Sequence, residues 1–179
     1  MVRAIGAFFV IAGVNGGFFS TSFEPLGLMI AKGRRTGVWQ ANKLLTGSLV
    51  VSQSMPRLVW NAEGHREAGA SDFLQAGPRL VDAGRAMTSL DRKKNAARSF
   101  IATNGGHLWV IGVVRNTSLA ELGRLLAMRG LMPGFEVSRA LNLDGGRSSA
   151  IHARLSDGST VTEPGWSTVR NYVAVVPLR

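Results

Sequence analysis

Glycine doublets that end apolar segments are the sequence feature that most constrains this fold. Three doublets, Gly16-Gly17, Gly105-Gly106 and Gly145-Gly146, occur among 22 glycines in 179 residues. Each follows a segment rich in apolar residues and a polar residue, Asn15, Asn104 or Asp144. Doublets spread in this way are typical of tight turns between strands and not of a flexible linker. They predict a β-rich domain.

The remaining pattern predicts an α+β fold, a strand-rich mixed sheet domain with hairpins and about one long helix. Hydrophobic residues make up 45% of the chain and charged residues 18%, which favours a folded protein over a disordered one. A helix is expected over residues 118–129, because Ser118 and Glu121 have the spacing of a capping box and leucines follow on one face. Without an internal repeat or a linker, we expect a single domain over residues 1–179.

Strands are expected wherever apolar and β-branched residues form short runs bounded by turn residues. These runs are residues 4–14, 28–30, 47–53, 57–60, 99–103, 107–114, 141–143, 151–155, 159–162 and 172–176. We also expect a basic turn at residues 32–35, a strand break at Met55-Pro56 and a charged, mobile segment over residues 85–97.

The net charge of +10 favours anionic partners: phosphorylated small molecules, acidic polysaccharide, nucleic acid or anionic membrane. Of the 21 basic residues most are arginine, which suits bidentate binding of phosphate or carboxylate. The basic residues are scattered, and no recognised nucleic-acid motif is present, so the sequence weighs against nucleic acid.

The chain contains no cysteine, which excludes disulfides, thiol nucleophiles and cysteine-bound zinc. Three histidines lie at no metal-ligand spacing, so we expect no metal and no cofactor. Near the N-terminus, Arg3 and the apolar run after it superficially resemble a signal peptide, but the run leads directly into Asn15 without an evident cleavage site. We expect a buried strand there and no transmembrane segment; localisation and oligomeric state stay open.

One segment, Leu141-Asn142-Leu143-Asp144-Gly145-Gly146-Arg147-Ser148-Ser149, admits two interpretations. Asp144-Gly145 is a common two-residue hairpin signal, so the segment can be a simple turn. Alternatively, a carboxylate at a strand end, two glycines and two hydroxyls form the floor of a pocket.

The same arrangement of an apolar strand, a polar residue and two glycines occurs at Asn15-Gly16-Gly17. Two such strand ends placed side by side would offer an amide, a carboxylate, hydroxyls and backbone N–H groups to one small ligand. Arg98 and Arg170, each next to a predicted strand, are the candidate anion binders.

These elements together resemble the phosphodiester glycosidase domain family over roughly residues 12–177. Five features carry the resemblance in this order: Asn15-Gly16-Gly17-Phe18-Phe19, Gly77-Pro78, Arg98-Ser99-Phe100-Ile101 leading into a hairpin, the capped helix, and the segment 141–149. The chain departs from the family pattern in an N-terminus that is short, in the context Ala97-Arg98-Ser99, and in Arg147 where glycine is frequent.

The resemblance implies hydrolysis of a sugar–phosphate diester at the anomeric carbon of the sugar, within an anionic sugar–phosphate or polysaccharide. It implies catalytic roles for three residues, with Asp144 as base or nucleophile and Arg98 and Arg170 binding the phosphate. It also implies substrate binding by Asn15, Gly16, Gly17, Gly77, Gly145, Gly146, Ser148 and Ser149.

Three alternatives remain open at the level of sequence. One is a non-catalytic glycan- or nucleotide-binding domain on the same fold, and another is a basic nucleic-acid-binding module. A serine hydrolase is the weakest, because Ser148-Ser149 lacks the Gly-x-Ser-x-Gly elbow. An ordinary glycosidase uses two carboxylates, and the candidates for the second are Glu24, Asp82 and Glu163.

Overall fold

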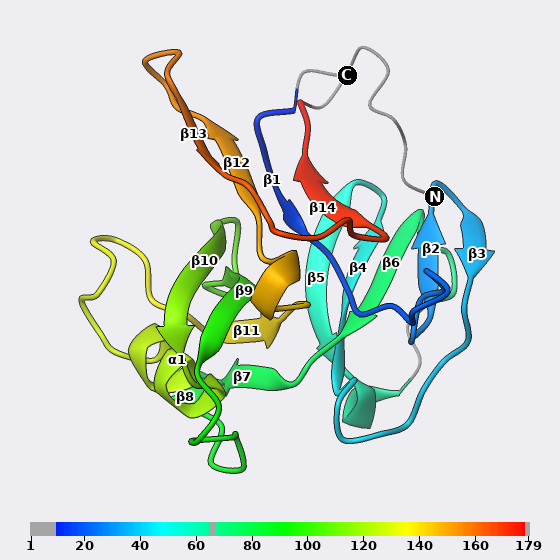
Figure 1. Cartoon of the computed structure of the whole chain (residues 1–179), viewed down its shortest axis with the longest axis horizontal. Coiled ribbons are helices and arrows are strands. Elements are labelled where there is room, and N and C mark those ends of the chain that lie inside the picture. Colours follow the sequence, from blue (N-terminus) through cyan, green and yellow to red (C-terminus); the bar gives the residue numbers. More distant parts are fainter. Residues whose placement is uncertain (1–9, 65–66, 178–179) are drawn as a thin grey trace.

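Three antiparallel sheets and one α-helix form the fold, in agreement with the predicted α+β class (Figure 1). A computed structural model of the chain describes residues 10–64 and 67–177. The first sheet has the order β13-β12-β1-β14 and unites the two ends of the described chain. Its strands are β1 (Ala12–Asn15), β12 (Ile151–Arg154), β13 (Thr160–Glu163) and β14 (Tyr172–Val175).

The second sheet, of order β10-β9-β11-β7-β8, carries the helix and leads into the segment 141–149. Its strands are β7 (Arg79–Asp82), β8 (Arg85–Ala86), β9 (Ala96–Thr103), β10 (Trp109–Thr117) and β11 (Arg139–Asn142). Strands β9 and β10 form the predicted hairpin, and Asn104 is a turn residue, accepting bonds from Gly106 N and Leu108 N. The hairpin is longer than predicted, because the segment expected to be mobile contains β8 and the start of β9.

The third sheet has the order β3-β2-β6-β4-β5. Its strands are β2 (Met29–Ala31), β3 (Arg34–Thr36), β4 (Gly47–Ser52), β5 (Met55–Trp60) and β6 (Asp72–Ala76), with a 3₁₀ turn η1 (Asn61–Glu63) after β5. The strand break expected at Met55-Pro56 is wrong, because the turn lies at Gln53 and Ser54, both at positive φ. Pro56 is tolerated in β5 because this is an edge strand. The basic turn predicted at residues 32–35 is shorter than expected, since Arg34 begins β3.

Helix α1 (Leu119–Leu126) is shorter than the predicted 118–129. Ser118 is its N-cap, with the hydroxyl accepting a hydrogen bond from Glu121 N at 3.1 Å. The Glu121 carboxylate accepts a bond from the Thr117 hydroxyl, so the first turn is closed from both sides. The buried face of the helix packs on the second sheet in one apolar cluster, which contains Leu80, Val81, Leu90, Phe100, Ala102, Leu122, Leu126, Val137 and Ala140.

A second apolar cluster lies where the three sheets meet, and it includes residues at and just beyond the end of β11. Leu141 and Leu143, the alternating apolar pair before Asp144, are fully buried. They pack with Val14 of β1, Trp60 of β5 and Ile101 of β9, so each sheet contributes to this cluster. The strand expected over residues 4–14 is described only as β1, and residues 4–9 of that prediction lie outside the described residues.

Candidate active site

Asp144 lies just beyond the end of β11, opposite the start of β9. In the antiparallel pairing of these strands Asn142 faces Phe100, and Leu143 N donates to Ser99 O at 2.8 Å. Continuing the register by one more residue places Asp144 opposite Arg98.

The hairpin-turn interpretation of Asp144-Gly145 is wrong. Strands β11 and β12, on either side of this segment, belong to different sheets and do not pair. Gly145 has extended backbone, and Gly146–Ser148 then form a single 3₁₀ turn, η2. The segment therefore crosses from the second sheet to the first, and Asp144 stands at the crossing.

The two strand ends with Gly-Gly pairs lie side by side, as predicted. Asp144 N donates to Gly16 O at 2.9 Å, and the side-chain amide of Asn15 donates to Asp144 O at 2.7 Å. Both backbone polar groups of Asp144 are thus bonded to the end of β1. The position of this residue is determined by two sheets at once.

Asn15 is fully buried, and its side chain is occupied by the protein itself. Its Oδ1 accepts hydrogen bonds from the Ser99 hydroxyl at 2.6 Å and from Ala150 N at 3.1 Å. The Ser99 and Ser149 hydroxyls are 3.0 Å apart and also buried. We name Asn15, Ser99 and Ser149 the Asn15 network. These buried side chains bond to one another, and Asn15 bonds to the backbone of Asp144. Their burial favours a role in positioning Asp144 over direct contact with substrate.

Asn171 is a residue of the site that sequence reasoning missed. Its Oδ1 accepts a bond from Gly17 N at 2.7 Å, and its backbone O accepts from Gly16 N at 2.9 Å. This residue begins the approach to β14 and brings its neighbour Arg170 next to the first Gly-Gly pair.

The Asp144 carboxylate is only partly accessible to solvent. Burial raises the pKa of the Asp144 carboxyl above its ordinary value, while hydrogen bonds from the Ser148 side chain and from Gly145 N oppose the shift. Gly145 N lies 2.9 Å from Asp144 Oδ1. Among the described residues no lysine or arginine forms an ion pair with this carboxylate. The group is a desolvated carboxylate with two hydrogen bonds, a state suited to accepting a proton or attacking a carbon.

The guanidinium of Arg98 is held by backbone carbonyls and not by a carboxylate. Its Nε donates to Thr117 O at 3.2 Å and its Nη2 to Lys94 O at 2.6 Å. Burial lowers the pKa of Arg98, and the charge of Asp91 opposes this shift, so the group stays cationic. A Cβ on Gly145 would lie 3.8 Å from Arg98 Cδ, which places the arginine stem against the segment that carries Asp144.

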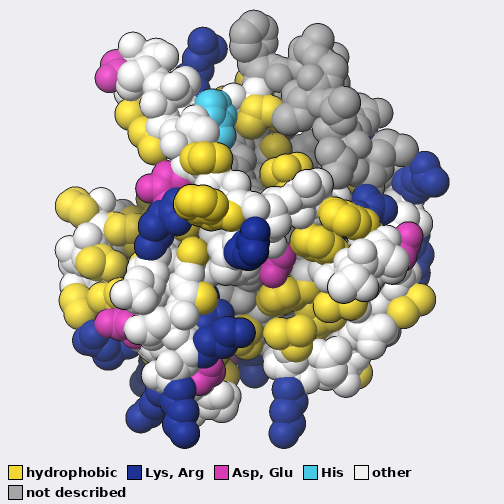
Figure 2. Space-filling model, viewed as in Figure 1, with side chains coloured by type: hydrophobic (Ala, Val, Ile, Leu, Met, Phe, Trp, Pro, Cys, Tyr) yellow, Lys and Arg dark blue, Asp and Glu magenta, His cyan; other side chains and the backbone are white. Residues whose placement is uncertain are grey.

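The loop before Arg98 carries several exposed cations beside the Asp91 carboxylate. Arg92, Lys93 and Lys94, in the loop between β8 and β9, are all exposed. Figure 2 shows lysine and arginine side chains gathered along the lower edge of the molecule, over this loop and around α1. Cations outnumber the single carboxylate, Asp91, in this loop.

The predicted glycines differ in what surrounds them. A Cβ on Gly16 would lie 1.9 Å from Asn171 Oδ1, and one on Gly145 would lie 2.9 Å from Ala97 O. A Cβ on Gly77 would lie 2.1 Å from Leu44 O, and Gly17 packs on the β6 backbone. At these four positions, the lack of a side chain lets neighbouring parts of the protein pack against the backbone. Gly146 alone of the five has open space around it, and its φ of 65° favours glycine.

None of the candidate second carboxylates contacts Asp144 in the described structure. Glu163 is paired with Arg115 at 2.7 Å. Asp82 accepts a bond from the Trp60 indole at 2.7 Å and lies near Arg79 and Arg139. Glu24 is exposed in the loop after β1.

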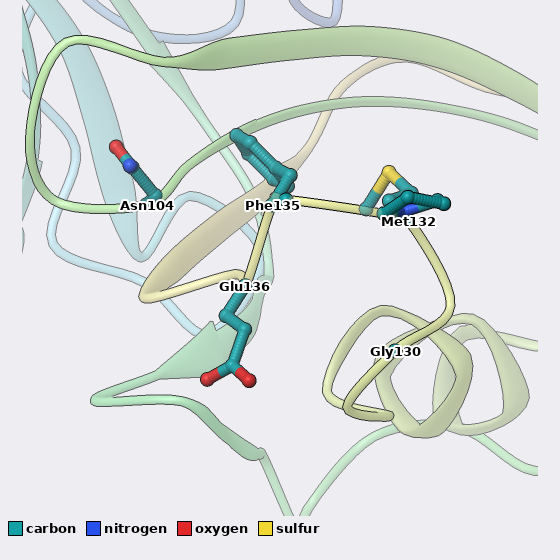
Figure 3. Close-up of a pocket in the computed structure, with 7 residues that line it drawn as sticks. Asn104, Gly130, Met132, Phe135 and Glu136 are labelled. Carbon is teal, nitrogen blue, oxygen red and sulfur yellow. The ribbon is translucent and has the colours of Figure 1, made fainter.

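Two cavities of the described structure differ in their distance from Asp144. One, of about 460 Å³, is lined by Asn104 and by the segment after α1 (Figure 3). Asn104 is at the far end of β9, roughly 16 Å from Ser99 at 3.3 Å per residue. The other, of about 640 Å³, lies on the first sheet, and Asn15 and Ala150 are in its wall. Asp144 lines neither of these two cavities.

Neither a metal cluster nor a membrane-spanning helix is found in residues 10–64 and 67–177. No three histidine, aspartate or glutamate side chains in these residues are grouped to hold a metal ion. Helix α1, the one α-helix described, is too short to cross a bilayer.

The described residues form a strand-rich α+β domain in which the half-buried Asp144 lies at the crossing between two sheets, with the stem of Arg98 against the same segment. A family model described as phosphodiester glycosidase matches residues 8–176. The chain belongs to the phosphodiester glycosidase family, as its motifs predicted.

Two solved structures share the fold. One is the catalytic domain of zebrafish N-acetylglucosamine-1-phosphodiester alpha-N-acetylglucosaminidase, auto-inhibited by its pro-peptide, with a TM-score of 0.62 and 17% identity. The match covers 95% of this chain and 64% of that one. The other is a hypothetical protein from Synechocystis, with a TM-score of 0.51 and 17% identity over 92% of this chain and 50% of that chain. No curated protein sequence matches the chain.

Proposed function

We propose that the protein hydrolyses a sugar–phosphate diester at the anomeric carbon of the sugar. Membership of the phosphodiester glycosidase family supports this reaction class. The observation that supports the proposal best is the half-buried Asp144 carboxylate, whose backbone is held by hydrogen bonds at the crossing between two sheets, with the stem of Arg98 against the same segment.

The chemistry follows from the leaving group. Breaking the bond between C1 of the sugar and the bridging oxygen leaves that oxygen on a phosphate monoester, which is stable as an anion and needs little protonation. The protein must then stabilise negative charge on the phosphate and positive charge at C1. Arg98 and Arg170 bind the phosphate in this proposal, because a guanidinium offers paired donors to phosphate oxygens.

Asp144 acts on the sugar side, in one of two ways. As a base it takes a proton from water while the water oxygen bonds to C1, and the configuration at C1 inverts. As a nucleophile it bonds to C1 itself, and water then releases the sugar with retention. Both roles need the carboxylate ionised, and its partial desolvation strengthens both.

The Asn15 network holds Asp144 for this step. Since Asn15 is buried with both Oδ1 bonds made, we assign it to positioning. Ser148, which bonds the carboxylate, tunes its basicity. Gly146 and the exposed Arg147 beside it are the residues of this segment best placed to meet substrate.

A non-catalytic glycan-binding domain is the second candidate. It is favoured by one observation, that no second carboxylate contacts Asp144 among the described residues. Both candidate functions predict that the protein binds the substrate, but only the enzyme predicts that the substrate is hydrolysed.

The test uses synthetic methyl phosphodiesters of several sugars, each linked through C1, incubated with the wild-type protein and with Asp144→Asn. The enzyme proposal expects release of methyl phosphate from at least one sugar, and a loss of roughly 10²- to 10⁴-fold in kcat for Asp144→Asn with binding retained. Circular dichroism controls for folding. Binding without turnover by the wild-type protein supports the glycan-binding candidate and contradicts ours.

A further inference from the structure

Trp166 has the most exposed large apolar side chain in the described chain, with 76% of its surface accessible. Tryptophan is usually well buried, because its ring carries a large apolar surface. An exposed indole is therefore a costly feature unless it serves a contact.

The backbone around Trp166 is firmly held, although the ring is exposed. Residues 164–170, named here the strap, connect β13 to β14 and pass the turn η2 that follows Asp144 (Figure 1). Trp166 N donates to Arg147 O at 2.7 Å. Gly165 packs so closely that a Cβ there would lie 3.2 Å from Arg147 O and Ser148 O.

Both ends of the strap are anchored as well. At its start, Glu163 forms an ion pair with Arg115 of β10 at 2.7 Å. At its end, Val169 is buried, and Asn171 bonds to Gly16 and Gly17. The strap is thus part of the same framework that holds Asp144.

The strap is bonded to the segment that follows Asp144. Arg147, whose O accepts the hydrogen bond from Trp166 N, is three residues after Asp144 and lies in the turn η2. Gly146, between Asp144 and Arg147 in the chain, borders open space, since a Cβ added there would meet no atom within 4 Å beyond its own chain neighbours.

We propose that Trp166 is the sugar-stacking residue of the substrate site, with the apolar C–H face of the pyranose lying on the indole while C1 faces Asp144. The inference rests on the proposed function and adds to it the group that binds the sugar. Aromatic side chains are common in ligand sites because they offer a flat apolar surface that excludes water. The exposed Arg147 on the same edge is then available to the hydroxyls or the phosphate.

The experiment compares Trp166→Ala and Trp166→Phe with the wild-type protein, using the methyl phosphodiester of the best sugar. A methyl group has no ring, so a loss measured with this substrate is assigned to the sugar. We expect Trp166→Ala to raise KM about tenfold with kcat changed by less than threefold, and Trp166→Phe to recover most of the loss. Met55→Ala, which truncates another exposed apolar side chain on the third sheet, is the matched control and should leave KM unchanged.

A KM unchanged in Trp166→Ala overturns the inference and leaves the proposed function intact. So does a loss that appears only when the methyl group is replaced by an aromatic aglycone, because the ring would then bind the aglycone. Tryptophan fluorescence gives a readout that does not depend on turnover. In the Asp144→Asn background, the sugar 1-phosphate should change the emission, and Trp166→Phe should abolish the change while Trp39→Phe preserves it. If the wild-type protein turns over no diester, the proposed function fails; an emission change that depends on Trp166 still supports stacking, and its absence overturns stacking too.

Discussion

Replacing Asn15 by alanine should lower the free energy of unfolding, because Asn15 holds the backbone of Asp144 in place. Asn15 is fully buried and makes three hydrogen bonds, to Asp144 O, to the Ser99 hydroxyl and to Ala150 N. In the alanine variant, Ser99 keeps Ser149 as a partner, but Asp144 O and Ala150 N lose theirs. A buried group left without its partner costs about 1–3 kcal/mol, so we expect a loss of roughly 2–5 kcal/mol in the free energy of unfolding.

For a domain of this size, that loss corresponds to a fall in Tm of roughly 5 to 20 °C. Urea unfolding followed by circular dichroism measures it, with the slope of the transition checked for constancy. Ser99→Ala should cost only about 1 kcal/mol, because Asn15 keeps its bonds to Asp144 and Ala150. The double variant should cost less than the sum of the two, since the residues share one network.

The matched control is Asn95→Ala, which removes an exposed asparagine and should change stability by less than about 0.5 kcal/mol. The reasoning is refuted if Asn15→Ala is as stable as Asn95→Ala. In that case the buried amide does not support the Asp144 backbone. Where the variant stays folded, its kcat should fall while KM changes less, as expected of a positioning residue.

Four further predictions rest on the same structure. Because burial raises the pKa of Asp144, the acid limb of the kcat/KM profile should lie at higher pH than for an ordinary aspartate, and a limb at the ordinary position would contradict the desolvation. The same shift means that the ionised carboxylate opposes folding, and this cost appears as pH rises through the folded-state pKa. Asp144→Asn should therefore have a higher Tm than the wild-type protein at neutral pH, and the difference should vanish in acid. Gly16→Ala should lower the free energy of unfolding, measured in urea, by about 3 kcal/mol, since its Cβ would overlap Asn171. Gly146→Ala should lower it by only about 1–2 kcal/mol, the cost of a positive φ in alanine. Equal losses for the two variants would contradict the packing around Gly16. Leu122→Ala should cost about 2–5 kcal/mol in the same assay, and the exposed Leu131→Ala should cost little.

Much of the fold was predictable because it depends on local patterns. The α+β class, the β9–β10 hairpin and the capped helix follow from alternation, from turn residues and from Ser118 with Glu121. The predictions were wrong where the outcome depends on which strands pair with each other. Pro56 is accepted because β5 is an edge strand, and the sequence alone does not state which strands are at an edge.

The site was predictable as a set of segments, and the contacts within it were not. Repetition of a polar residue before Gly-Gly predicted that Asn15 and Asp144 would meet, and their strand ends do. Burial then separates their roles, since Asn15 is enclosed while Asp144 remains partly open. Asn171 was missed because its bonds to Gly16 and Gly17 span more than 150 residues, a distance over which no local pattern acts.

Hydrolysis in water enriched in ¹⁸O tests the central claim most directly. The methyl phosphodiester of the best sugar is cleaved by the wild-type protein, and mass spectrometry locates the label in the two products. Attack at the anomeric carbon predicts ¹⁸O in the sugar and none in methyl phosphate. Label in the phosphate would mean attack at phosphorus, and would contradict a glycosidase mechanism centred on Asp144.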